Sequence, residues 1–267
     1  MHPRLSVSEM CTYPLPFAEE LDLWDELGVR KVGLLINKVD AFGRDAAIVA
    51  LRERSVRATT VITTMFDLSD LASWDETRAA VNDSVDLAAA VGGCTYFTPG
   101  RRDGRQFDEL AASLADAVAP CVKYAESCGV TLAIEPSLRT DVSFVHTLRD
   151  GTDVAERAGI GVIADVGNCW MERDPEDAVR RAGSRLAVVQ ISDAVYGTVE
   201  HPSPGGRVVP GDGDLPLDEF LRAALDTGYT GPFELEVVGP AIEAEGHAAA
   251  LRRSVERANA LLYEVLP

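Results

Sequence analysis

The chain alternates between two kinds of segment along its whole length, and this alternation limits the folds that it can adopt. Short runs rich in apolar and β-branched residues recur roughly every thirty residues, each followed by a polar loop and then an Ala- and Leu-rich amphipathic segment. These runs predict eight strands, at 4–10, 31–37, 58–66, 94–99, 130–136, 160–166, 186–193 and 233–239. Strands that alternate with helices indicate βαβ units and a parallel sheet.

The intervening segments have the apolar spacing of helices. The first, 16–28, places Phe17, Leu21 and Trp24 on one face and ends at Gly28, a residue typical of helix C-termini. Further helices are predicted at 75–92, 107–129, 141–159, 216–228 and 247–266. Eight strand–helix repeats favour one closed (β/α)8 barrel over an open doubly wound sheet, and no GxGxxG motif follows the first strand. We expect residues 1–267 to form a single TIM barrel domain.

Charge and cysteine content narrow the classes of partner. The net charge is −18 and the isoelectric point about 4.6, so nucleic acids and anionic membranes are poor partners and a small-molecule substrate is expected. No apolar run approaches the ~18 residues of a membrane span, and the first residues lack the features of a signal peptide. The five cysteines form no CxxC pair, which suits reduced thiols. We therefore expect a cytoplasmic protein.

Four successive predicted strands end in side chains that carry oxygen. These are Glu135 on the fifth strand, Asp165 on the sixth, Gln190 and Asp193 on the seventh, and Glu234 and Glu236 on the eighth. Catalytic residues of (β/α)8 barrels lie at the C-terminal ends of the strands. Because parallel strands end at one mouth of the barrel, we expect these side chains to converge there.

Alternation along the eighth strand decides which acid lies nearer the mouth. Phe233, Leu235 and Val237 share one face, which suits the helix layer. Glu234 and Glu236 share the other face, which points into the barrel. We expect Glu236 near the mouth and Glu234 in a deeper position.

Crowded carboxylates repel one another unless a cation or shared protons compensate them. The all-oxygen set predicted to ligate a metal consists of Glu135, Asp165, Gln190 and Glu236. Such a set favours Mg2+ or Mn2+ over Zn2+. The alternative is that each acid caps the following helix or pairs with an arginine.

Five motifs that occur in one order resemble a known superfamily. They are "LAIEPSLR" (132–139), the Asp165-x-x-Asn168 step, "VVQISDA" (188–194), "GRVVPGDGDLPL" (206–217) and "FELEV" (233–237). Together they resemble the xylose-isomerase-like TIM barrel superfamily of sugar-phosphate isomerases, ketose 3-epimerases and inosose isomerases or dehydratases. The resemblance covers essentially the whole chain, and its most specific part is the R-x-x-PGDGD run that begins at Arg207.

The resemblance implies roles for individual residues. Glu135 and Glu236 correspond to metal ligands that also act as acid and base, and Asp165 corresponds to a further ligand. Gln190 stands on the strand where the superfamily usually has a histidine ligand. Arg207 corresponds to an arginine that orients substrate oxygens.

Asn168 stands where the superfamily often has a substrate-binding histidine. It can hydrogen-bond a hydroxyl but cannot titrate. The side chains that we expect to bind substrate are Arg207, Asn168, Trp170, Asp193 and His201.

The expected function is a divalent-metal-dependent isomerase or epimerase that acts on a sugar, ketose or related polyol carbonyl compound through an enediolate. Glu135 and Glu236 form the expected acid/base pair. If a β-hydroxyl leaves instead, the same enediolate leads to dehydration, and a metal-free barrel that only binds a small ligand also stays open. Four histidines and the acidic surface argue against the zinc-dependent DNA-repair endonucleases of the superfamily. Barrels of this type often self-associate, so we expect that the protein can form a homo-oligomer.

Overall fold

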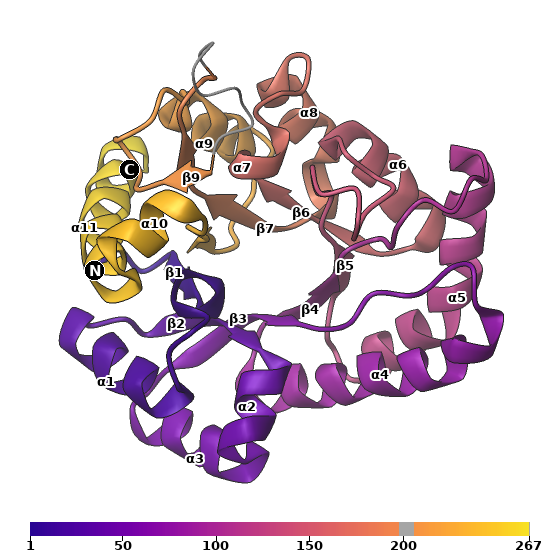
Figure 1. Cartoon of the computed structure of the whole chain (residues 1–267), viewed down its shortest axis with the longest axis horizontal. Helices are drawn as coiled ribbons and strands as arrows, with labels where there is room; N and C mark the ends of the chain where they lie inside the picture. Colours follow the sequence, from indigo (N-terminus) through magenta and orange to yellow (C-terminus); the bar gives the residue numbers. More distant parts are fainter. Residues whose placement is uncertain (198–205, 267) are drawn as a thin grey trace.

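The chain forms a closed barrel of parallel strands surrounded by helices (Figure 1). This computed structural model describes residues 1–197 and 206–266. The eight barrel strands are β1 (Leu5–Ser8), β2 (Lys31–Leu35), β3 (Arg57–Ile62), β4 (Cys94–Phe97), β5 (Leu132–Ile134), β6 (Gly161–Asp165), β7 (Leu186–Ile191) and β10 (Phe233–Leu235). Strand β10 closes the barrel by pairing with both β7 and β1. The predicted (β/α)8 fold is confirmed.

Helices cover the outside of the barrel (Figure 1). They are α1 (Phe17–Leu27), α2 (Ile36–Phe42), α3 (Arg44–Glu53), α4 (Trp74–Val91), α5 (Phe107–Ser127), α6 (Leu148–Ala158), α7 (Val166–Cys169), α8 (Pro175–Ala182), α9 (Leu217–Asp226), α10 (Pro240–Glu245) and α11 (His247–Val265). Within the described part of the chain, no helix is both long and apolar enough to cross a bilayer.

Two differences from the predicted helices have local causes. The sequence does not predict α2 and α3, because Gly43 (φ +99°) divides this segment into two helices too short for a clear apolar period. The helix expected from residue 141 begins only at Leu148. There the Thr147 hydroxyl caps α6 by accepting a hydrogen bond from Asp150 N at 3.0 Å.

The barrel has an apolar outer layer and a mixed interior. Phe233 and Leu235 belong to the large core between strands and helices. Glu234, on the opposite face of β10, is fully buried inside the barrel and accepts hydrogen bonds from Thr59 and Thr60 of β3. A small apolar cluster also lies inside, and it consists of Cys94, Tyr96, Ala133, Ile163 and Val188. The inward direction predicted for Glu234 is therefore correct.

A short antiparallel hairpin follows the seventh barrel strand. Strand β7 ends at Ile191, and β8 (Asp193–Ala194) pairs with β9 (Arg207–Val208). This pairing returns the chain to the barrel mouth and delivers Arg207 there.

Candidate active site

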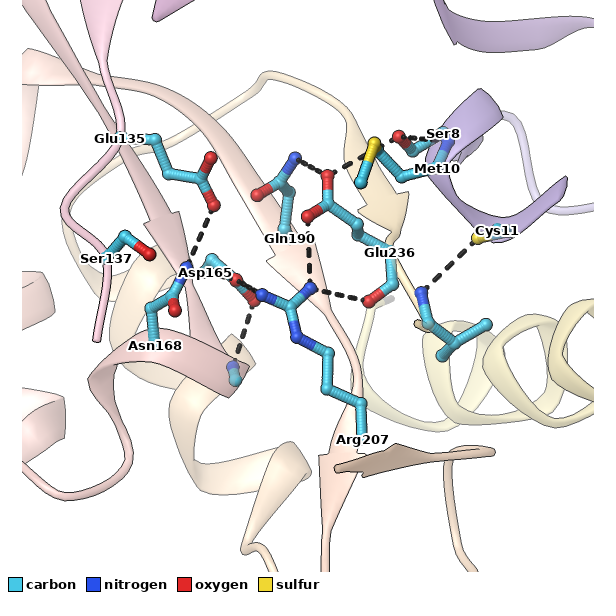
Figure 2. A network of polar contacts seen from close by, with 12 residues as sticks. Ser8, Met10, Cys11, Glu135, Ser137, Asp165, Asn168, Gln190, Arg207 and Glu236 are labelled. Carbon is cyan, nitrogen blue, oxygen red and sulfur yellow. Dashed lines mark hydrogen bonds and ion pairs between the residues drawn. The ribbon is translucent and has the colours of Figure 1, made fainter. Parts of the chain in front are cut away.

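Three carboxylates meet at the C-terminal mouth of the barrel (Figure 2). Glu135 follows β5, Asp165 ends β6 and Glu236 follows β10, and one oxygen from each lies within 4.8 Å of the others. Their exposed fractions are only 7%, 0% and 5%, respectively. The strand order thus brings these three acids together as expected, while their chemical roles stay predictions.

A cavity of about 190 Å3 opens beside these carboxylates. Its lining combines polar and apolar side chains, namely Met10, Ile62, Thr63, Tyr96, Thr98, Glu135, Ser137, Arg139, Val142, Asn168, Arg207, Glu236 and Val238. A larger cavity of about 640 Å3 lies at the opposite end of the barrel, among the strand starts, and none of the three carboxylates lines it. The smaller cavity is therefore the candidate active site.

Asn168 links two of the carboxylates. Its Nδ2 donates to Glu135 Oε1 at 2.9 Å and to Asp165 Oδ2 at 2.7 Å. Its Oδ1 accepts a longer hydrogen bond of 3.4 Å from Leu138 N. Asp165 is fixed further because its Oδ1 accepts from Gly167 N at 2.9 Å, which caps α7. The amide at position 168 thus holds Glu135 and Asp165 in one arrangement.

Arg207 lies between the carboxylates of Asp165 and Glu236 (Figure 2). Its Nη2 donates to Asp165 Oδ2, and its Nη1 donates to Glu236 Oε1 at 3.1 Å and to the Glu236 carbonyl oxygen at 2.8 Å. Gly167 permits this approach, because a Cβ there would lie 2.8 Å from Arg207 Nε and 2.5 Å from Ser192 Oγ. The alternative expectation, in which each acid caps a helix or pairs with an arginine, therefore holds in part: Asp165 caps α7, and both Asp165 and Glu236 pair with Arg207.

Gln190 lies on β7 beside the three acids. Its Nε2 donates to Glu236 Oε2 at 2.8 Å, to Tyr96 Oη at 3.1 Å and to Glu234 Oε1 at 3.2 Å. Its Oε1 is buried and has no hydrogen-bond partner among the described residues. In Figure 2 this oxygen points toward the side of the site that holds Glu135 and Asp165. Metal ligation by Gln190 stays a prediction.

Burial and mutual repulsion shift the acidity of the site. Desolvation, followed by the charges of Glu236 and Asp165, raises the pKa of Glu135 well above its ordinary value. Burial also raises the pKa of Asp165 to about 6, while Arg207 opposes this shift. Without further positive charge, Glu135 and Asp165 therefore hold their protons to a higher pH than exposed carboxyl groups do.

The sequence does not single out two side chains that hydrogen-bond Glu236. The hydroxyl of Tyr96 donates to Glu236 Oε2 at 3.3 Å, and Ser8 Oγ reaches the same oxygen at 3.4 Å. Alternation along β4 places Tyr96 on the same face as Cys94, and both belong to the interior cluster. Alternation along the strand therefore predicts that Tyr96 points into the barrel, but not that it contacts Glu236.

Asp193 lies away from the carboxylate cavity, and its expected role in substrate binding stays a prediction. Both of its oxygens are occupied by backbone N–H groups of the hairpin and of the loop that follows it, and its carboxylate does not line the cavity. The strand ends before Asp193, so its side chain turns toward its own loop rather than toward the mouth. It organises the PGDGD segment that follows Arg207.

Trp170 also lies outside the carboxylate cavity. Its ring packs against Tyr196 with centroids 5.6 Å apart, and both line a separate cavity of about 250 Å3 with Pro216 and Phe220. Trp170 follows α7, whose turn carries it away from the three acids. His201, the other loop residue expected to bind substrate, lies outside the described residues.

The sequence pattern of xylose isomerase-like TIM barrels matches residues 21–259. The chain belongs to this family. The expected superfamily is thereby confirmed.

Individual relatives are distant. D-psicose 3-epimerase from Ruminiclostridium cellulolyticum is 29% identical over 125 residues, a match that covers 45% of this chain and only 39% of that protein. Protein SMc04130 from Sinorhizobium meliloti 1021 has a TM-score of 0.84 at 23% identity, covering 97% of this chain and 98% of that one. The IOLI protein, whose structure is described with a bound zinc atom, has a TM-score of 0.86 at 16% identity, covering 98% and 99%. The two structural likenesses establish the fold alone.

Proposed function

We propose that this family member is a divalent-metal-dependent isomerase or epimerase of a sugar, ketose or related polyol carbonyl compound. The observation that carries the proposal is the convergence of Glu135, Asp165 and Glu236 at the catalytic end of the barrel, beside a cavity that Glu135 and Glu236 line. The partial match to a D-psicose 3-epimerase supports the same substrate class.

The residues present fit a divalent cation. Glu135, Asp165 and Glu236 each offer an oxygen at short mutual distance, and the buried Oε1 of Gln190 has no donor in the described structure. Oxygen donors of this kind favour Mg2+ or Mn2+, although the similar IOLI structure is described with zinc. Bound there, a cation would supply Lewis-acid polarisation of a carbonyl oxygen and thereby acidify the neighbouring C–H group.

We assign the proton transfer to Glu135 and Glu236. They follow β5 and β10, which are separated in the barrel by β6 and β7, so the two carboxyl groups reach the cavity from different sides. One carboxylate removes the proton beside the carbonyl and leaves an enediolate. The other returns a proton to the opposite face, which gives an epimer, or to the next carbon, which gives an isomer.

Hydrogen-bonding groups around the cavity suit a compact polyol. Thr63, Thr98 and Ser137 line it together with the amide of Asn168. Arg207 provides a guanidinium that can hold substrate oxygens while it stays next to Asp165. A volume of about 190 Å3 restricts the reacting part of the substrate to a small molecule.

Two alternatives follow from the same geometry. Loss of a β-hydroxyl from the enediolate would make the protein a dehydratase acting on a related polyol. A metal-free ligand-binding barrel is favoured by one observation, which is that Arg207 and Asn168 already give each of the three carboxylates a partner. Bound-metal analysis separates this alternative from the metal-dependent ones.

Solvent exchange in D2O tests the proposal. Candidate ketoses and inososes are incubated with the Mn2+-loaded and Mg2+-loaded protein, and deuterium is followed by NMR at the carbon beside the carbonyl. We expect exchange in wild type and in E243Q, which changes an exposed glutamate of α10, and none in E135Q or E236Q. Exchange that persists in both site variants, or a protein that neither retains nor is stabilised by Mn2+, Mg2+ or Zn2+, would remove the proposal.

A further inference from the structure

Gln190 hydrogen-bonds two carboxylates, one from Glu234 on β10 and one from Glu236, which follows that strand. The register of the sheet places Gln190 beside Asp165 on β6 and beside Glu234 on β10. Its Nε2 donates at once to Glu234 Oε1 and to Glu236 Oε2, at 3.2 and 2.8 Å. The amide is therefore flanked by acids on the side that faces β10.

These contacts decide which end of the amide faces the site. An ionised carboxylate can only accept hydrogen bonds, so a reversed amide would place its carbonyl oxygen against two other acceptors. The NH2 group is thus fixed on the side of Glu234 and Glu236. The carbonyl oxygen is left on the side of Glu135 and Asp165, where it is buried without a partner in the described structure (Figure 2).

Glu234 is itself rigidly held below the site. Thr59 Oγ1 donates to its Oε2 at 2.7 Å, Thr60 Oγ1 lies 3.0 and 3.1 Å from its two oxygens, and Ser6 Oγ donates at 3.3 Å. Gly33 leaves room for the carboxylate, because a Cβ there would lie 2.7 Å from Glu234 Oε2. This network fixes the acid from β1 and β3.

The two glutamates differ in what else they can bind. Glu236 lines the cavity, so a cation or substrate competes for its oxygens. Glu234 is fully buried, does not line the cavity and sits one residue pair deeper on β10. Of the two glutamates, only Glu234 can keep the amide oriented after Glu236 has been engaged. The Tyr96 hydroxyl, which lies 3.1 Å from Gln190 Nε2, can accept or donate and so does not decide the orientation by itself.

We propose that Glu234 is a positioning residue that fixes the Gln190 amide with its carbonyl oxygen toward the cation site. This inference rests on the proposed function, since it concerns the cation that the three carboxylates would share. With its amide fixed in this way, Gln190 can offer an oxygen ligand to the cation from β7. Without such a partner the amide could rotate and turn its NH2 group, which repels a cation, toward the site.

A double-mutant cycle tests whether Glu234 acts through Gln190. The dissociation constant of Mn2+ is measured by titration calorimetry on the metal-stripped full chain at pH 8, for wild type, E234M, Q190M and the double variant. We expect each single variant to weaken Mn2+ binding about tenfold, as for other supporting residues of metal sites. We expect the double variant to match Q190M, because both changes remove the same oriented oxygen.

A conservative control separates positioning from a general structural effect. E234Q keeps an acceptor oxygen for Gln190 and can turn its NH2 toward the Thr59 hydroxyl, so it should bind Mn2+ within about threefold of wild type. If E234M does not fold, T59V replaces it in the double-mutant cycle. T59V should weaken Mn2+ binding less than E234M, and this effect should be absent in the Q190M background.

The outcomes distinguish this inference from the proposed function. Unchanged Mn2+ affinity in E234M, or losses that multiply in the double variant, would overturn the role of Glu234 while leaving the metal site in place. A wild-type chain that binds none of Mn2+, Mg2+ and Zn2+ would overturn both.

Discussion

Replacing Asp193 with asparagine separates loop organisation from substrate binding. Oδ1 accepts hydrogen bonds from the N–H groups of Ala194 at 2.8 Å and Leu215 at 3.2 Å, and Oδ2 accepts from Gly211 at 2.8 Å and Gly213 at 3.1 Å. Asparagine keeps the shape but turns one oxygen into NH2, which faces two donors. Hydrogen bonds to a charged group contribute about 1.5–3 kcal/mol each, so losing two should lower the free energy of unfolding by about 3 kcal/mol or more.

Urea unfolding followed by circular dichroism measures this loss. D212N is the matched control, because Asp212 lies in the same loop and only forms an ion pair with Arg253 at the surface. It should cost at most about 1 kcal/mol. If D193N is no less stable than D212N and instead raises the KM, Asp193 binds substrate and our assignment to the loop is refuted.

Two further predictions concern residues around the carboxylates. In G167A the new Cβ would lie 2.8 Å from Arg207 Nε, so we expect D2O exchange to fall at least tenfold. G104A controls for general strain, because its Cβ meets open space although its φ of +95° disfavours alanine, and it should exchange normally. Burial raises the pKa of Glu234 to about 7 from 4.5, so the folded metal-free protein holds this proton more tightly than the unfolded chain. Stability should therefore fall as pH rises from about 4.5 through 7, by up to about 3 kcal/mol, and urea titrations of E234Q should have a flatter profile.

The positions of side chains at the strand ends could be predicted, because the βα repeat and the alternation of side chains along a strand determine them. Once eight βα repeats are recognised, Glu135 and Asp165 must reach the same mouth, and alternation alone places Glu236 inside the barrel. Tyr96 obeys the same alternation on β4 but looks like an ordinary core residue. Its part in the site became visible only through its hydrogen bond to Glu236.

Side chains beyond the strand ends could not be placed in this way. Trp170 and Asp193 both lie in segments whose direction depends on local turns, namely α7 and the β8–β9 hairpin. Asp193 was expected to bind substrate because it follows a strand that supplies a ligand, yet its two oxygens bind four backbone N–H groups. Such contacts join residues about twenty positions apart in an irregular loop, where neither period nor composition indicates a partner.

Arg207 connects the two descriptions of the site, one with arginine pairing and one with a metal. Three carboxylates and one guanidinium, when all are ionised, leave two negative charges inside a buried mouth. Burial raises the pKa of Glu135, and the charges of Glu236 and Asp165 raise it further, because its partner Asn168 contributes a hydrogen bond but no charge. A divalent cation would balance the two remaining charges without displacing Arg207 from the mouth. If Glu236 ligated such a cation, one N–H of Arg207 Nη1 would become free for a substrate oxygen, while its hydrogen bond to the Glu236 carbonyl oxygen could persist. The arginine pairing would then be the resting arrangement of a group that binds substrate, the role that the resemblance implies for Arg207 and that stays a prediction.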